Sequence, residues 1–588
     1  MSFFDVLSLL GGLAMFLYGR GLLSDKLEKI TGGKLEQIFE KITSNRFKGL
    51  LLGVIITAVV QSSTATTVML VGFVNSGLMR LSQAIAVIMG ANIGTTVTTW
   101  ILSLSGLDGD NFLIKMLNPV NLSPLALLAG VVMRMMSKND RKKDIGGILV
   151  GFALLMLGMG AMQESVSPLQ DSPKFASILT IFTNPVMGMV VGAVITAILH
   201  SSAASIGMLQ AFATRTGQFT FGMALPILLG QNIGTCVTAL FSSVGANKNA
   251  KRVAVVHLYF NCIGAVIMLV LYYGLDAIFD FAFADEMVNG FSISVVHTVF
   301  NVVTTIILLP FTSFLEKLAY LTIKDDPADN SVEMPVVLDE RLLNTPGIAI
   351  EQTKNVTNRM ASISKNTIFL AIDLMKSYDE DKAQMVLMDE DCVDRYEDSI
   401  GSYLVKLSGR SLVPEDNKRV SLILHAIGDF ERISDHAVNI LDSAKEIHEK
   451  NIGFSESAKR ELEVLFRALQ DILDITVKAF TEQDLSIARK VEPLEEVVDV
   501  LCAEMKNRHV ERLQEKICTI EQGFIFTDLL TNVERVSDHC SNVAVNLIQI
   551  SENAFDNHQY LNQLKKEDNE EFLRKFDEYS LRYLLPKM

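Results

Sequence analysis

The first 320 residues contain seven apolar segments of about 20 residues each, and these constrain the fold more than any other feature of the chain. A helix of that length crosses the roughly 30 Å of hydrocarbon in a bilayer. Because lipid offers the backbone no hydrogen-bond partners, such segments must be helical. The sequence therefore predicts an all-α, polytopic membrane domain over residues 1–320. The predicted crossings lie near 3–23, 81–104, 113–136, 145–163, 220–243, 253–273 and 293–315.

Two further apolar stretches, 49–78 and 188–214, carry polar residues at their centres. The centres are Gln61-Ser-Ser-Thr64 and His200-Ser-Ser-Ala203. Each stretch is too long for one simple crossing and is interrupted halfway. Non-helical backbone is tolerated at membrane depth only beside protein or a water-filled cavity. We therefore predict two re-entrant hairpins.

Lys and Arg concentrate in three connecting loops, 26–48, 134–143 and 248–252, whereas the loops 105–112 and 274–291 contain none. Loops rich in basic residues favour the cytoplasmic side of a membrane. Seven crossings and two hairpins put every basic loop inside. This predicts a multi-pass protein of the cell membrane, with its N-terminus outside and the remainder of the chain in the cytoplasm.

The crossings and hairpins form two repeats, about 1–136 and 145–273, followed by an extra helix at 293–315. Since each repeat has three crossings, the second is predicted to be inverted relative to the first. Inverted repeats with broken elements that meet near the midplane are an architecture of secondary transporters. The first hairpin is then expected to enter from the cytoplasm and the second from outside.

A second polar motif follows each hairpin, as Gly90-Ala-Asn-Ile-Gly-Thr and as Gly230-Gln-Asn-Ile-Gly-Thr. Asn92 follows Ser63 by 29 residues, and Asn232 follows Ser202 by 30. Small and hydroxyl residues also let membrane helices pack closely, which is the structural alternative. Two coupled elements repeated at nearly equal spacing favour a binding site. Few acidic residues lie within the spans, which argues against a proton relay or a transporter of metal cations.

The hairpin centres offer uncharged donors and acceptors beside helix termini, whose free N–H groups and partial positive charge suit an anion. Gly94 and Gly234 are expected to let their helices unwind and turn carbonyl oxygens toward Na⁺. For His200, a packing role and a ligand role both remain open. The predicted substrate and ion ligands are Gln61, Ser62, Ser63, Thr64, Asn92, Thr95, Thr96, His200, Ser201, Ser202, Asn232 and Thr235.

The rest of the chain carries a formal net charge of −19, against +4 for residues 1–320, and shows helical periodicity from about residue 345. The pattern Glu-Arg-x-Ser-Asp-His occurs there twice, 103 residues apart. Two three-helix units are therefore predicted to form one six-helix domain over 345–560. A linker at 321–344 precedes this domain, and a tail at 561–588 follows it.

Within the repeated pattern, Glu431 and Asp435 are spaced i and i+4 and share a helix face, and Glu534 and Asp538 repeat the pair. Like charges held side by side destabilise a helix unless something neutralises them. A divalent or iron-type cation would do so, because hard oxygen ligands suit Mg, Mn or Fe. Salt bridges to Lys and Arg across the bundle are the alternative.

The duplicated Gln-Ser-Ser-(Ser/Thr) element followed by Gly-x-Asn-Ile-Gly-Thr resembles the type II sodium–phosphate cotransporter family over about residues 1–320. The resemblance implies phosphate as substrate, Na⁺ as coupling ion and hairpin tips that carry the site. By that match, residues 61–64, Ser201 and Ser202 are phosphate or sodium ligands. His200 departs from the Gln expected at its position, and Ala203 from the hydroxyl residue that matches Thr64.

The Glu-Arg-x-Ser-Asp-His pattern resembles the PhoU family of phosphate-signalling regulators over about residues 345–555. The resemblance implies metal clusters on Glu-x-x-x-Asp motifs and a regulatory role. It adds Asp394 and Asp499 to the four metal-ligand candidates above.

The sequence therefore predicts a sodium:phosphate symporter with a regulatory domain, and a phosphate exporter or a membrane-tethered sensor are the alternatives. An enzyme has little support, because the chain has no Walker loop, nucleophile elbow or zinc motif. The expected partners are inorganic phosphate, Na⁺ and membrane lipid, with no nucleic acid and with a second copy or a signalling protein left open.

Overall fold

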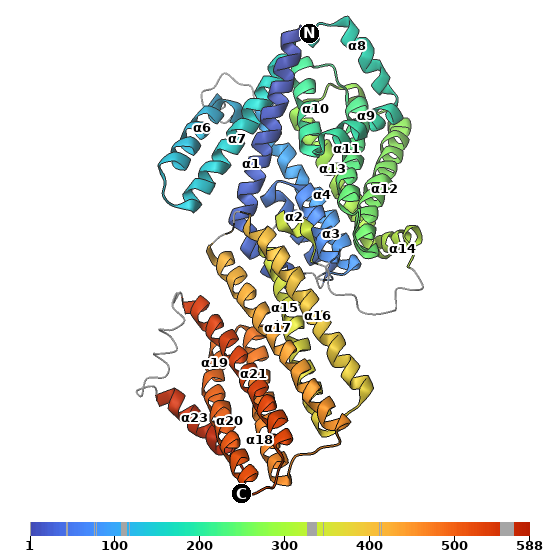
Figure 1. Cartoon of the computed structure of the whole chain (residues 1–588). Coiled ribbons are helices and arrows are strands. Elements are labelled where there is room, and N and C mark those ends of the chain that lie inside the picture. Colours follow the sequence, from blue (N-terminus) through green and yellow to red (C-terminus); the bar gives the residue numbers. More distant parts are fainter. Residues whose placement is uncertain are drawn as a thin grey trace. The chain divides into compact units, whose positions relative to one another are not determined.

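The chain folds into helices and connecting loops. The computed structural model describes residues 2–42, 45–75, 77, 79–106, 115–116, 118–325, 338–344, 346–410, 412, 414–552 and 570–587. These residues include no β-strand, which confirms the all-α class. They divide into two compact units, Met1–Val332 and Glu333–Met588 (Figure 1). Residues 326–337 of the predicted linker and 561–569 of the predicted tail lie outside the described residues.

Seven helical segments in the described part of the first unit are long and apolar enough to cross a membrane, and each overlaps one predicted crossing. Five of the helices are α1 (Phe3–Ile42), α4 (Leu81–Ser103), α6 (Pro119–Met136), α7 (Asp140–Ser165) and α11 (Phe221–Ser242). The sixth is α12 (Lys248–Phe279), and the seventh runs through α13 (Gly290–Leu308) and α14 (Thr312–Thr322). Residues 113, 114 and 117 of the crossing predicted at 113–136 lie outside the described residues.

Both predicted hairpins are present as pairs of short helices. The first is α2 (Arg46–Val60) followed by α3 (Ser63–Asn75), and the second is α9 (Pro185–Leu199) followed by α10 (Ser202–Thr216). The residue that ends each first helix has a left-handed backbone, with φ of 58° at Gln61 and 50° at His200. Non-glycine residues rarely adopt this conformation. It breaks both helices at the same point of the repeat.

The segment 164–187, which connects the predicted crossing 145–163 to the second predicted hairpin, is largely helical. It contains α8 (Pro173–Leu179) and a 3-10 turn, Thr180–Thr183. Together these form the segment Pro173–Thr183, which meets α9 at an angle of 105°. Ser172 caps the N-terminus of α8 by accepting from the Phe175 N–H, and Pro173 occupies the first helical position. Serine followed by proline is a frequent helix start.

Helices α1 and α7 pack against each other in opposite directions, through glycines. A Cβ on Gly12 would lie 3.0 Å from the Gly158 carbonyl oxygen, and one on Gly19 would lie 2.7 Å from that of Gly151. As the residue number rises along α1, it falls along α7, so the two helices are antiparallel. Because α1 and α7 open the two repeats, this direction agrees with the predicted inversion.

The prediction that Gly94 and Gly234 unwind their helices is wrong, because α4 and α11 continue without a break through both motifs. The glycines of these motifs serve close packing. A Cβ on Gly90 would lie 2.0 Å from the Leu50 carbonyl oxygen of α2, and one on Gly230 would lie 1.9 Å from that of Met189 in α9. Each re-entrant helix is thereby seated on the motif helix of its own repeat.

The second unit is a helical bundle whose two halves follow one another in the chain. The first half comprises α15 (Pro346–Lys376), α16 (Glu380–Ser408) and α17 (Pro414–Glu449). The second comprises α18 (Glu456–Glu482), the short α19 (Leu485–Ala488), α20 (Val491–Gln514) and α21 (Ile520–Glu552), and α23 (Glu570–Arg582) packs on α20. The six long helices of 346–552 confirm the predicted bundle.

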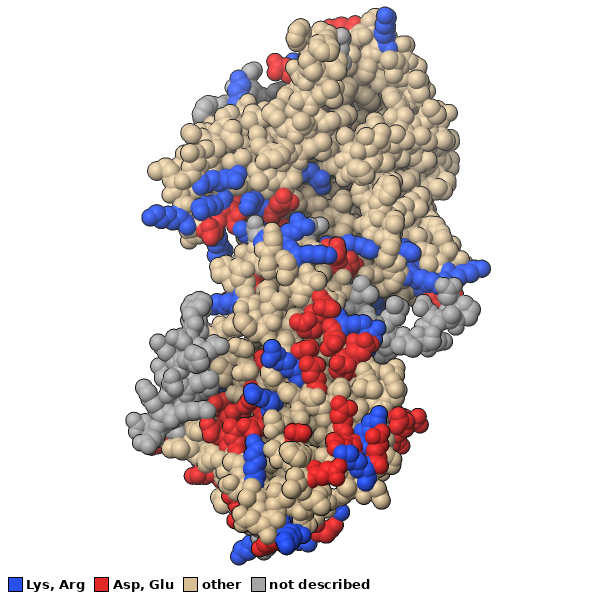
Figure 2. Space-filling view, in the orientation of Figure 1, with Lys and Arg blue, Asp and Glu red and all other residues tan. Residues whose placement is uncertain are grey.

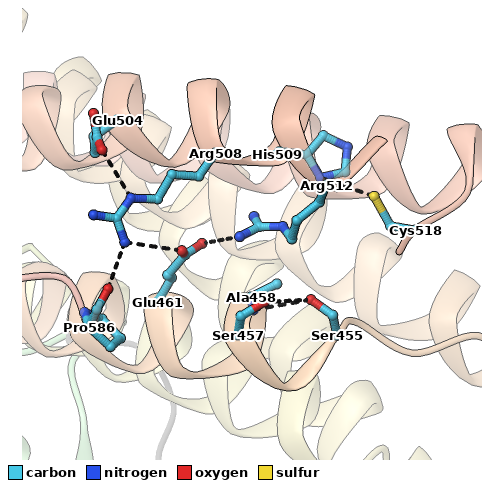
Figure 3. Close-up of polar contacts among 10 residues, drawn as sticks. All are labelled: Ser455, Ser457, Ala458, Glu461, Glu504, Arg508, His509, Arg512, Cys518 and Pro586. Atoms are coloured by element: carbon cyan, nitrogen blue, oxygen red, sulfur yellow. Dashed lines mark hydrogen bonds and ion pairs between the residues drawn. The ribbon is translucent and has the colours of Figure 1, made fainter. Parts of the chain in front are cut away.

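A buried charge cluster fixes the second half of the bundle (Figure 3). Glu461 of α18 is 1% exposed and accepts from Arg512 at 2.8 Å and from Arg508 at 3.4 Å, both on α20. Arg508 also donates to the Pro586 carbonyl oxygen at 2.7 Å. The cluster therefore joins α18, α20 and the C-terminal segment, and buried charges of this kind must stay paired.

Candidate functional site

The two hairpin tips lie within reach of one side chain, Arg20 of α1. Its Nη1 donates to Ser201 Oγ at 2.8 Å, and its Nη2 donates to the Gln61 carbonyl oxygen at 3.4 Å. Arg20 thus contacts the tips of both repeats. A cation inside a membrane span is costly and usually marks a functional site.

Each tip leads directly into a capped helix. Ser62 Oγ accepts from the Ala65 N–H at 3.2 Å, and Ser201 Oγ accepts from the Ala204 N–H at 3.1 Å. These two predicted ligands therefore also cap α3 and α10. Ser63 and Ser202 begin the helices and are 3% and 2% exposed. Thr64 lies one residue further into α3 and is half-buried.

Gln61 and His200 share a backbone conformation but differ in their surroundings. The Gln61 side chain is buried, accepts from Thr98 Oγ1 at 2.9 Å and donates to the Ala58 carbonyl oxygen. His200 is exposed on the surface of the first unit. Gln61 is therefore held against α4, whereas no hydrogen bond fixes the His200 imidazole among the described residues.

The threonines of the second motif are turned toward their own helices. Thr95 and Thr96 donate to the carbonyl oxygens of Ala91 and Ile93 at 2.9 and 2.7 Å. Thr235 donates to the Gln231 carbonyl oxygen at 3.0 Å. The hydroxyl groups of Thr95, Thr96 and Thr235 therefore donate hydrogen bonds within α4 and α11. Each hydroxyl oxygen can still accept a hydrogen bond or bind a cation through a free lone pair.

The asparagines of the two motifs instead reach other helices. Asn92 donates to Asn261 Oδ1 of α12 at 3.4 Å. Asn232 Oδ1 lies 3.4 Å from His297 Nε2 of α13, and His297 Nδ1 lies 3.4 Å from Thr99 Oγ1 of α4. His297 therefore bridges the motif helices of both repeats.

Three further residues of this network, Arg20, Asn261 and His297, were not predicted, although the sequence carried a signal for each. Arg20 is the single basic residue in the apolar segment 3–23. Asn261 and His297 belong to a third duplicated pattern, His257-Leu-Tyr-Phe-Asn261 and His297-Thr-Val-Phe-Asn301, 40 residues apart. All four of its polar side chains are buried.

The acidic candidates of the second unit form two groups related by the internal repeat. Carboxylate oxygens of Glu390, Asp394 and Asp435 lie within 4.8 Å of one another, and those of Glu495, Asp499 and Asp538 do the same. Four of these six residues were predicted as metal ligands. Glu390 and Glu495, which precede Asp394 and Asp499 by one helical turn, complete the two groups.

Glu431 and Glu534 occupy matching positions but have different partners. Glu534 accepts from Lys506 at 2.8 Å, which is the salt bridge that the sequence left as the alternative. Burial, followed by the charges of Asp435 and Asp394, raises the pKa of Glu431 to about 7. Burial also raises the pKa of Asp394 and of Asp538. A cation would relieve this crowding of like charges.

A cavity of about 830 Å³ lies between the two halves of the bundle and joins these groups. It is lined by acidic residues, including Glu431, Asp435 and Asp538, and by the basic side chains Arg432 and Arg535. His436 and His539 stack across it with ring centroids 5.8 Å apart. The cavity can therefore offer hard oxygen ligands to a metal and two guanidinium groups to an anion.

Taken together, the seven spans, the antiparallel repeats and the paired hairpins define a helical membrane protein of secondary-transporter architecture. Two family models match the chain. Residues 15–164 and 162–284 match the Na⁺/Pi-cotransporter model, and residues 357–444 and 462–547 match the PhoU domain. Residues 15–284 therefore form a Na⁺/Pi-cotransporter domain, and the second unit carries two PhoU domains.

Similar proteins match one or both parts. YjbB of Salmonella typhimurium, which carries the name of a candidate inorganic phosphate export protein, is 25% identical over 92% of this chain and 97% of its own length. The sodium-dependent phosphate transport protein 2A of Rattus norvegicus is 42% identical over 16% of this chain and 15% of its own. The crystal structure of PhoU from Pseudomonas aeruginosa covers 36% of this chain and 99% of that chain, at 21% identity and a TM-score of 0.33.

Proposed function

We propose that the chain transports inorganic phosphate across the cell membrane in a Na⁺-dependent manner, under the control of its PhoU domains. The match of residues 15–284 to the Na⁺/Pi-cotransporter model and the names of the similar proteins support phosphate transport. The observation that carries the proposal is the contact of Arg20 with both hairpin tips.

The tips have the chemistry of an anion site. The N-termini of α3 and α10 begin there, with backbone N–H groups and a partial positive charge. Arg20 adds a full positive charge and a planar donor set that suits a phosphate group. Its Nε is buried without a hydrogen-bond partner among the described residues, which leaves a donor for the substrate.

Four buried oxygen atoms support a sodium site in the second repeat. Thr196 Oγ1, Ser202 Oγ, Ser205 Oγ and Gln231 Oε1 have no hydrogen-bond partner among the described residues. Gln231 donates to the Ser205 carbonyl oxygen at 3.0 Å, so its amide lies against α10. In the first repeat, Thr57 and Thr66, which match Thr196 and Ser205, bond to each other at 3.1 Å. Neutral oxygens of this kind suit Na⁺, and the Thr57–Thr66 hydrogen bond makes the matching pair of the first repeat less available for an ion.

The repeats supply a mechanism. Because one tip belongs to each of two oppositely directed repeats, a rocking motion of one repeat against the other would open the site to each side in turn. Sodium bound beside Ser202 would stabilise the second tip in the conformation that binds phosphate. An inward Na⁺ gradient then drives import. The name of YjbB favours the opposite direction, and export is the second candidate function.

We infer that the second unit is cytoplasmic and regulatory. Two of the three basic loops predicted to lie inside, 26–48 and 134–143, meet in the first unit, where Lys26, Lys29, Arg134 and Lys143 line one pocket. Each of the two acidic groups would hold one metal ion, the first through Glu390, Asp394 and Asp435 and the second through Glu495, Asp499 and Asp538. Asp435, Glu495 and Asp538 also line the cavity. A cation there would neutralise the carboxylates, and the two arginines would let the cavity respond to a phosphate-bearing ligand.

Transport is tested with the purified chain in proteoliposomes, with Na⁺, phosphate and sulfate varied independently. We expect uptake of labelled phosphate that needs Na⁺ and that sulfate does not replace. Phosphate binding without flux would instead assign the membrane unit to sensing. Arg20→Lys and Arg20→Gln separate the role of the guanidinium: Lys should retain part of the flux and Gln should abolish it, while both reach the membrane.

A further inference from the structure

A second basic site lies where the C-terminal end of α6 and the N-terminal end of α7 meet the middle of α1, and it contains no residue of the hairpins. A pocket of about 390 Å³ is lined there by Lys26, Lys29, Arg134, Asp140, Lys143 and Asp144. Four cations face two carboxylates, so the pocket has a surplus of positive charge. Neither the hairpins nor the acidic cavity of the PhoU domains involves these residues.

Two neighbouring glycines of α7 position the basic side chains. A Cβ on Gly147 would lie 2.9 Å from Lys26 Cγ, and one on Gly146 would lie 3.0 Å from Arg134 Cγ. The stems of Lys26 from α1 and Arg134 from α6 therefore lie across the bare backbone of α7. Because Gly146 and Gly147 have no side chains, Lys26 of α1 and Arg134 of α6 can both lie against the same turn of α7.

The carboxylates leave part of this charge uncompensated. Asp144 accepts from Lys26 at 2.8 Å and lies 3.3 Å from Lys29, so one carboxylate serves two lysines. Asp140 lies 3.4 Å from Lys143 on an exposed surface, where ion pairs are weak. Arg134 has neither a hydrogen bond nor an ion pair among the side chains that the structure describes.

The pocket borders an apolar surface of the kind that faces lipid. On α6, Leu128, Met135 and Met136 are 63%, 81% and 80% exposed. The next residues, Ser137 and Lys138, are polar, so the apolar surface ends at the level of the pocket. Figure 2 shows that much of the visible surface of the first unit is uncharged and that most of its basic side chains gather at one end.

We propose that this pocket binds a phosphate-bearing anion, and that its source is the headgroup of an anionic phospholipid. Basic pockets between membrane helices on the cytoplasmic side suit such headgroups. Arg134 and Lys143 would hold the phosphate, while the acyl chains lie along the exposed face of α6. The loop 274–291, which follows the matching helix of the second repeat, has no Lys or Arg. The site therefore belongs to one face of the membrane.

Lipid binding by the purified full-length chain tests the proposal. Native mass spectrometry from a neutral detergent would measure the affinity for phosphatidylglycerol, with phosphatidylcholine, which has no net charge, as the comparison.

The double variant Arg134→Gln with Lys143→Gln leaves the contacts of Lys26 and Lys29 with Asp144 intact. Loss of two cations should weaken phosphatidylglycerol binding about 30-fold. The control Lys138→Gln with Lys142→Gln removes two exposed cations of the same turn outside the pocket, and should leave the affinity within about twofold.

Inorganic phosphate, added as a competitor, distinguishes the two sources of the ligand. We expect phosphate to leave the bound lipid in place; displacement by phosphate at a similar concentration would assign the same site to the free anion. The readout is bound lipid, so phosphate held at the hairpin tips does not contribute, and the result is independent of transport.

Gly147→Ala, which displaces Lys26 without removing a charge, should also weaken the binding of phosphatidylglycerol. Equal binding in the pocket variants, equal loss in the control, or equal binding of phosphatidylcholine would overturn the proposal.

Discussion

At the scale of single residues, the two repeats use matching hydroxyls differently. Ser202 and Ser205 keep buried oxygens without a hydrogen-bond partner in the described structure, whereas Thr66, the counterpart of Ser205, is bonded to Thr57. If these oxygens hold Na⁺, then Ser202→Ala and Ser205→Ala should each raise the Na⁺ concentration for half-maximal phosphate flux about tenfold, because one ligand is lost.

The control for these variants is Ser177→Ala, which removes an exposed hydroxyl that donates within its own helix to the Lys174 carbonyl oxygen. Its Na⁺ dependence should equal that of the wild type. An unchanged Na⁺ dependence in both Ser202→Ala and Ser205→Ala would place the sodium elsewhere.

Glu431 shows how one carboxylate links pH, metal and stability in the PhoU domains. Burial and the neighbouring carboxylates raise its pKa from 4.5 to about 7. The folded protein therefore binds a proton more tightly than the unfolded chain, and the ionised form destabilises the metal-free protein above pH 7. This penalty disappears as the pH falls through about 7 toward 4.5.

Glu431→Gln should therefore raise the melting temperature of the chelated protein more at pH 8 than at pH 5. The same change should lower the amount of divalent or iron-type metal that is retained at pH 8, as measured by elemental analysis. Asp442→Asn, an exposed position on the same helix, serves as the control. If Glu431→Gln is no more stabilising at pH 8 than at pH 5, the carboxylate is not held under charge repulsion.

At the scale of elements, the glycines of the Asn-Ile-Gly-Thr motifs seat the re-entrant helices. A Cβ on Gly230 would lie 1.9 Å from the Met189 carbonyl oxygen, so backbone must move to admit it. Gly230→Ala should destabilise the first unit by about 1–3 kcal/mol, the usual cost of overpacking, and lower the melting temperature in detergent. Gly21→Ala on α1, where nothing lies within 4 Å, should leave it unchanged or slightly higher. Equal melting temperatures for the two variants would mean that α9 and α11 separate easily.

At the scale of the whole molecule, the spans and hairpins were predictable because their signals are local. The length of an apolar run fixes a crossing, and polar residues at the centre of such a run fix a break. The role of Gly94 was not predictable, because unwinding and close packing both require a missing side chain. Its partner, the Val54 carbonyl oxygen of α2, becomes visible only when the two helices are side by side.

Only part of the candidate site was predicted. The hairpin serines were predicted because their motif is repeated in the sequence. Arg20 and His297 were missed, although a lone cation in an apolar segment and a pattern repeated after 40 residues were available in the sequence. The salt bridge of Glu534 depends on Lys506, whose counterpart in the first half of the bundle is Gly401. Only the packing of α20 against α21 reveals that Lys506 contacts Glu534.

Sodium and phosphate are proposed to bind together in one membrane site, and reciprocal flux measurements would test this joint binding. Labelled Na⁺ and labelled phosphate would be followed in the same proteoliposomes, each with and without the other ion. If one alternating-access cycle carries both ions, phosphate should accelerate Na⁺ entry as Na⁺ accelerates phosphate entry. We predict that both accelerations are present in the wild type and that both are lost in Arg20→Gln. Phosphate flux that proceeds without Na⁺ entry would contradict the account.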